Sequence, residues 1–97
     1  MKQDISVIIL TYNEEQHIER CIKSLLPFAK EIFLVDSFST DKTVEIAQNL
    51  GAKIYQNPWP NNHAIQFNWG LENCPVSTKW IMRMDADEYV LPELSNE

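Results

Sequence analysis

The sequence Ile5-Ser6-Val7-Ile8-Ile9-Leu10-Thr11-Tyr12-Asn13-Glu14 decides the fold. Its first six residues are almost all β-branched or leucine, without polar alternation, which is typical of a strand buried on both faces. A polar cluster follows at once. The next segment repeats apolar residues every three to four positions, as one face of a helix does, at Ile18, Cys21, Ile22, Leu25 and Leu26. A buried strand that leads directly into a helix predicts an α/β sheet.

The same alternation continues to the end of the chain. Further strands are predicted over residues 32–36, 52–56 and 80–84, with helices between them that run from about residue 41 to Gly51 and from 63 to 73. This order predicts a parallel sheet with right-handed crossovers, helices on both faces and the strand order 3-2-1-4. No linker or repeat divides the chain. We expect residues 1–97 to be the first part of one larger, apparently truncated domain.

Composition narrows the partners. A net charge of −6 over 97 residues disfavours nucleic acid, which needs a basic face, and implies that an anionic ligand would need a bridging cation. The two cysteines, Cys21 and Cys74, form no metal-site spacing and are expected to be reduced thiols of a cytosolic protein. No signal peptide and no run long enough to span a bilayer are expected.

Carboxylates follow the predicted strands at the point where each one ends. Asp85 and Asp87 come directly after the run 80–84, and Asp36 ends the run that starts at Ile32. The carboxyl ends of parallel strands meet at one edge of the sheet, where such sheets bind ligands. An isolated Asp-x-Asp is common in solvated turns, but oxygen ligands at this edge suit Mg²⁺ or Mn²⁺.

Other polar and aromatic residues have simpler interpretations. Asn13 is predicted to cap the first helix, with Gln16 as its capping-box partner, and the exposed N–H groups beside Glu14 favour a polar or anionic ligand. The side chain of Asp36 is expected to be free for a ligand, because residues 39–41 already offer caps for the second helix. We expect core or rim positions, or no ligand role, for His17, Trp59, His63, Phe67, Trp69 and Tyr89.

Four segments, taken in order, resemble the family 2 glycosyltransferases of GT-A fold. They are Ser6–Glu15, Val35–Thr43, Asn68–Gly70 and Asp85–Asp87. The resemblance covers nearly the whole chain, and its specificity lies in the ordered set. It implies the N-terminal, nucleotide-sugar-binding part of a single Rossmann-like GT-A domain, without the acceptor-binding half. The implied reaction is metal-assisted transfer from a nucleotide diphosphate sugar, a UDP-sugar, to an unidentified glycan or lipid-linked acceptor.

The resemblance also implies residue roles. Thr11 and Tyr12 would line the nucleotide pocket, and Asp36 would accept a hydrogen bond from the base. Asp85 would lie near the ribose and the metal, and Asp87 would bind the Mg²⁺ or Mn²⁺ that bridges the diphosphate. Further substrate-binding candidates at the pocket wall are Asn13, Glu14 and Asn68. No catalytic residue is assigned in this segment, because the general base of inverting members lies in the second half of the domain.

The resemblance further implies a place and a pathway. Synthesis of cell-surface polysaccharide or lipopolysaccharide is expected, in the cytoplasm and peripheral to the inner face of the membrane. The sequence departs from the family at Phe38, where many members have glycine, and it lacks the usual basic residue shortly before Asn68.

Three alternatives stay open on the residues alone. A nucleotidyltransferase would also pair a parallel sheet with aspartates, but it usually has a Gly-rich basic loop after the first strand. A phospho-acceptor receiver domain would have its acidic pair after the first strand rather than the fourth. A nucleotide-binding fragment without turnover fits the same residues as the transferase.

Overall fold

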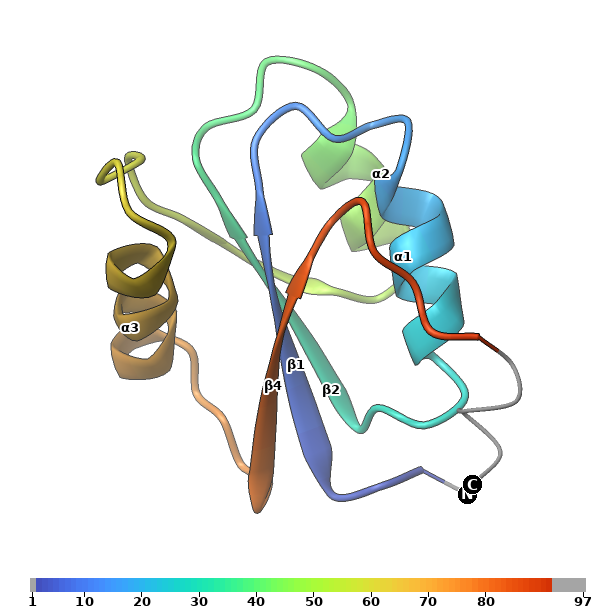
Figure 1. Ribbon diagram of the computed structural model, residues 1–97. Helices are drawn as coiled ribbons and strands as arrows, with labels where there is room; N and C mark the ends of the chain where they lie inside the picture. The colour runs from blue at the N-terminus through green and yellow to red at the C-terminus, as the bar shows by residue number, and fades with distance from the viewer. Residues whose placement is uncertain (1, 92–97) are drawn as a thin grey trace.

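The computed structural model describes residues 2–91 and has seven elements (Figure 1). In chain order they are β1 (Ile5–Thr11), α1 (Ile18–Leu25), β2 (Glu31–Asp36), α2 (Thr43–Asn49), β3 (Lys53–Gln56), α3 (His63–Asn73) and β4 (Trp80–Asp85). The predicted alternation of strands and helices is confirmed.

The four strands form one parallel sheet in the order β3-β2-β1-β4, as the sequence predicts. β1 lies inside the sheet, with Ile8 beside Phe33 of β2 on one side and beside Arg83 of β4 on the other. Since both edges of β1 are paired and both faces are covered, Ser6 to Thr11 are all buried. The continuous apolar run therefore records the central position of this strand.

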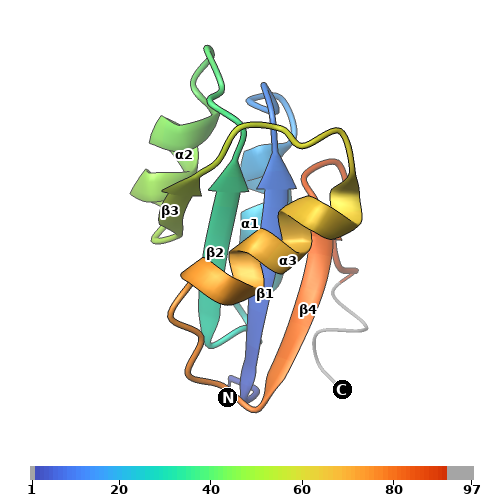
Figure 2. The same ribbon diagram turned by 90° about the vertical axis from the view of Figure 1, so that its left-hand side faces the viewer.

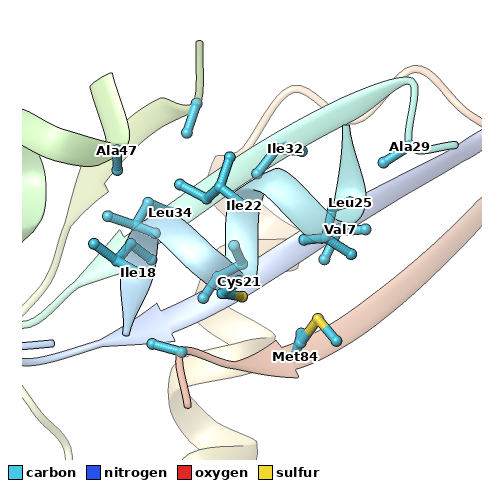
Figure 3. Packing of buried hydrophobic residues seen from close by; sticks show 13 residues of the cluster. Val7, Ile18, Cys21, Ile22, Leu25, Ala29, Ile32, Leu34, Ala47 and Met84 are labelled. Atoms are coloured by element: carbon cyan, nitrogen blue, oxygen red, sulfur yellow. The ribbon is translucent and has the colours of Figure 1, made fainter. Parts of the chain in front are cut away.

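Helices cover both faces of the sheet. α1 and α2 pack on one face and α3 on the other (Figures 1 and 2). Alternate residues of β1 enter two separate cores: Val7 and Ile9 pack with α1, and Ile8 and Leu10 pack on the α3 side. Figure 3 shows the larger core, in which the apolar stripe of α1 lies over the sheet.

Gly70 lets α3 approach the sheet closely. A Cβ atom at this position would lie 3.0 Å from Cγ2 of Val35 and 3.4 Å from Cγ2 of Ile8. The helix therefore lies nearer to β1 and β2 at Gly70 than a larger side chain would allow.

The start of α1 differs from the prediction. α1 begins at Ile18 after His17, which makes no side-chain capping bond, so Asn13 is not the cap. Asn13 instead adopts a left-handed backbone with φ 52°, which asparagine tolerates better than most residues, and its Oδ1 accepts the Thr40 N–H at 2.8 Å. The side chain is used to join two loops rather than to start a helix.

The third helix matches its predicted limits. Asn62 caps α3 by accepting the Ile65 N–H at 3.0 Å, which fixes the first turn at His63. Among the helices of residues 2–91, none is both long enough and apolar enough to cross a membrane.

Candidate functional site

A pocket of about 600 Å³ opens where the C-terminal ends of β1, β2 and β4 meet, at the predicted edge of the sheet. Its lining residues come from the ends of three strands, from the loop after β1 and from the segment that leads into α3. They are Leu10, Thr11, Tyr12, Glu14, Ser37, Trp59, His63, Asp85, Ala86 and Asp87. None of these residues is lysine or arginine, so the lining offers no fixed cation for an anionic ligand.

The turn after β4 presents two carboxylates to this pocket. The N–H of Asp85 donates to Glu88 Oε1 at 2.8 Å, the N–H of Glu88 donates back to the Asp85 carbonyl at 2.9 Å, and Arg20 Nη2 donates to the Asp87 carbonyl at 3.3 Å. Ala86 is buried in the larger core between the two aspartates. The Glu88 and Arg20 side chains, backbone atoms and the Ala86 methyl hold the turn, and no hydrogen bond within residues 2–91 occupies either aspartate carboxylate.

This donor set fits a hard divalent cation. Within residues 2–91 no three His, Cys, Asp or Glu side chains gather closely enough to hold a metal by themselves. Mg²⁺ in nucleotide sites is usually bound by one or two carboxylates together with phosphate oxygens and water. Asp85 and Asp87 supply two such oxygen ligands and leave the other positions to a ligand.

The Asp36 carboxylate is not free in the structure, contrary to the sequence expectation. Asp36 is 0% exposed, and its oxygens accept hydrogen bonds from Thr11 Oγ1 (2.7 Å), the Ser39 N–H (2.8 Å), the Ser39 hydroxyl and Gln56 Nε2 (3.3 Å). Four protein donors thus use its acceptor positions, and Asp36 lies behind the pocket lining. Its contact with a base stays a prediction, and such a contact would require one of these donors to leave.

The loop after β1 is fastened to the loop after β2. The N–H of Asn13 donates to Ser39 Oγ at 2.8 Å, and the N–H of Glu14 donates to Thr43 Oγ1 at 2.7 Å. Asn13 joins the loops and lies outside the lining, whereas Glu14 reaches the pocket with its carboxylate 3.1 Å from His17 Nδ1. Tyr12 is left 57% exposed at the pocket. The loop therefore holds Tyr12 out of both cores in a fixed place.

The segment after β3 and the first residue of α3 contribute two residues to which the sequence analysis gave no ligand role. β3 and β4 lie at opposite edges of the sheet, so this crossover passes the C-terminal ends of β2 and β1 before α3 begins near the end of β4 (Figure 2). Trp59 and His63 line the pocket as a result, while Asn68 lies exposed on α3 and outside the lining. The strand order 3-2-1-4 was the signal that could have found them.

Comparisons with known proteins agree with this geometry. The model of glycosyl transferase family 2 matches residues 6–96. An uncharacterized glycosyltransferase of Rickettsia bellii is 42% identical over 97 residues, which are 100% of this chain and 32% of that protein. The lipopolysaccharide core biosynthesis glycosyltransferase LpsC of Rhizobium meliloti is 36% identical over 105 residues, and the match covers 96% of this chain and 37% of LpsC.

Solved structures show the same arrangement. S. aureus TarS superimposes with a TM-score of 0.79 at 29% identity, covering 99% of this chain and 30% of its own. Glucosyl-3-phosphoglycerate synthase of Mycobacterium tuberculosis, crystallised with Mn²⁺ and UDP, superimposes with a TM-score of 0.72 at 25% identity, covering 88% of this chain and 35% of its own. The chain spans about a third of the length of these relatives. It has the parallel sheet of the GT-A fold, and it belongs to glycosyl transferase family 2.

Proposed function

We propose that this chain binds the nucleotide-sugar donor, a UDP-sugar, of a glycosyltransferase, with Asp85 and Asp87 holding Mg²⁺ or Mn²⁺. One observation carries the proposal: both aspartates enter a pocket whose lining contains no lysine or arginine. A diphosphate and two carboxylates in one pocket would repel each other unless a cation lay between them. The UDP and Mn²⁺ found together in the structural neighbour from M. tuberculosis support the assignment.

The residues divide the donor between them. Asp85 and Asp87 hold the ion, which when bound neutralises the departing diphosphate as a Lewis acid. Thr11, Tyr12 and Ser37 line the same pocket, and we assign the nucleotide to them. Asp36 acts from behind by orienting Thr11 and Ser39, whose hydroxyl groups it binds.

The acceptor and the base for its hydroxyl are assigned to a part of the domain outside residues 1–97. The relatives are about three times as long, which leaves room for such a part. An unidentified glycan or lipid-linked acceptor, in cell-surface polysaccharide or lipopolysaccharide synthesis, is supported by the named role of LpsC. We place the protein in the cytoplasm, peripheral to the inner face of the membrane. Residues 1–97 alone should bind donor without transferring sugar, since positioning and general-base assistance each contribute on the order of 10²-fold or more.

Calorimetry tests the proposal through the substitution Asp87→Asn. With Mn²⁺ present, UDP should bind the variant at least about tenfold more weakly, because one charged oxygen ligand is lost. Glu72→Gln is the matched control, since it removes the same charge from an exposed position on α3 outside the pocket lining. Equal UDP affinity of wild type and Asp87→Asn, both with Mn²⁺ and in EDTA, would refute the metal role.

A further inference from the structure

Trp59 is a large aromatic side chain that contributes to neither core of the described residues. It is 42% exposed and lines the pocket, with its ring edge-on to His63 at a centroid distance of 4.9 Å and an interplanar angle of 68°. Keeping 42% of an indole in water forgoes a large part of the free energy that its full burial would supply. Its contribution is therefore to be sought in the pocket rather than in folding.

The chain holds Trp59 in place from both sides. Pro58 and Pro60 flank it, which fixes the φ angles of both neighbours and confines the backbone of Trp59 itself to extended conformations. The segment is also anchored just before Trp59. The N–H of Asn57 donates to the Asp36 carbonyl at 3.0 Å, and its side chain donates to Oε1 of the buried Gln66 at 2.9 Å.

Gln66 completes this anchor from α3. Its Nε2 donates to the Asn57 carbonyl at 3.2 Å and to Ser37 Oγ at 3.1 Å. The capped first turn of α3 in turn holds His63 against the indole. An exposed ring with so little freedom loses little entropy when a ligand stacks on it.

Tyr12 lines the same pocket but comes from a different part of the chain. It belongs to the loop that leads from β1 to α1, whereas Trp59 belongs to the segment that leads from β3 to α3, and these two helices lie on opposite faces of the sheet (Figure 1). Two exposed aromatic residues thus line one pocket, from segments that lead to helices on opposite faces of the sheet. A planar ring is the ligand group that makes most contact with such a pair.

Building on the proposed function, we propose that Trp59 is a nucleobase-binding residue of the donor site, on which the base stacks across from Tyr12. The base, rather than the sugar, is assigned here because Asp85 and Asp87 hold the diphosphate end at β4. The ribose then separates the base from the metal, so that the base lies toward β1 and β2. The segment that carries Trp59 crosses the ends of these two strands. His63 is a positioning residue that supports the indole through its edge.

The test measures binding of UMP, ribose 5-phosphate and UDP-glucose to the full-length protein with the substitutions Trp59→Ala and Trp59→Phe. Stacking on an aromatic side chain is worth between about fivefold and about 150-fold in affinity per base. Trp59→Ala should weaken the binding of UMP and of UDP-glucose by the same factor, within this range. The loss for UMP should be the same in EDTA. Trp59→Phe should keep most of the wild-type affinity. Ribose 5-phosphate, which has no base, should be indifferent to either change.

Trp80→Ala is the matched control, because Trp80 is 63% exposed but lies at the start of β4, at the opposite end of the sheet from the pocket. It should leave all three affinities unchanged, and circular dichroism should show the same fold in every variant. Unchanged UMP affinity in Trp59→Ala overturns the proposal, and a loss confined to UDP-glucose assigns Trp59 to the sugar instead. If UMP shows the Trp59 effect while Asp87→Asn binds UDP normally, only the metal proposal fails. If wild type binds none of the nucleotides, both fail.

Discussion

Replacing Thr43 with valine should destabilise the protein and release the loop that carries Tyr12. Thr43 is the fully buried first residue of α2, and its hydroxyl group accepts the Glu14 N–H at 2.7 Å and donates to Asp41 Oδ1. Valine keeps the shape of the side chain but leaves the Glu14 N–H unpaired. A partly buried donor without a partner costs about 1–3 kcal/mol.

Urea denaturation measures this loss. With a slope of about 1–3 kcal/mol per molar urea, the midpoint should fall by about 1 M while the slope stays unchanged. Thr43→Ser is the control, since it retains the hydroxyl group and loses only a methyl group, at about 0.8 kcal/mol. UDP affinity should also fall in Thr43→Val and be kept in Thr43→Ser, because only the first variant removes the bond between Thr43 and the loop of Tyr12.

The pH dependence of the stability gives a second test of the Thr43 hydroxyl group, through its hydrogen bond to Asp41. Burial alone would raise the pKa of Asp41, but hydrogen bonds from the Thr43 hydroxyl and N–H outweigh it and lower the pKa below its usual value. A lowered pKa in the folded state adds stability above the ordinary aspartate range, and this stability is lost as the pH falls through the folded-state value. The difference between wild type and Thr43→Val should therefore shrink below about pH 4. The reasoning is refuted if Thr43→Val is as stable as Thr43→Ser at pH 7.

Two other groups give independent tests. The pKa of Glu31 is lowered, chiefly by the hydrogen bond from the Ser6 hydroxyl. Glu31→Gln should therefore lower the melting temperature at pH 7, and the melting temperature of the variant should fall less than that of the wild type below about pH 4. An acid profile equal to that of the wild type would contradict this. Burial, together with the nearby charges of Glu88 and Asp87, raises the pKa of Cys21 to about 12, and burial raises the pKa of Cys74 to about 11. Neither thiol should therefore react with Ellman's reagent at pH 8 until urea unfolds the protein.

The fold could be predicted because its signals are local. The continuous apolar run of β1 and the stripe of α1 each report burial on their own, and alternation with helices leaves few possible topologies. The predicted start of α1 was wrong for a different reason. Asparagine is a common helix cap, but the partner of the Asn13 side chain is Thr40, on the next loop. A contact between loops leaves no periodic pattern in the sequence.

The site was predicted where chemistry follows a strand end and missed where it depends on packing. Asp85 and Asp87 belong to the strand that ends beside them, so their place at the pocket followed from the topology. The state of the Asp36 carboxylate depends partly on donors from two other strands, Thr11 of β1 and Gln56 of β3, which the sequence around it does not show. Trp59 enters the pocket only because the crossover from β3 must pass the other strand ends, which composition alone does not reveal.

The pairing of β1 with β4 also has a consequence for synthesis on the ribosome. Among the strands of residues 2–91, β1 is made first, and its second neighbour β4, which places Trp80 beside Ile5, is made last. At about 5–20 residues per second, roughly 4–15 seconds pass between the two. During that time one edge of a strongly apolar strand has no native partner, and such an edge can pair with another chain. The nascent protein is therefore most open to aggregation, and most in need of a chaperone, until the strand that ends in Asp85 has left the exit tunnel.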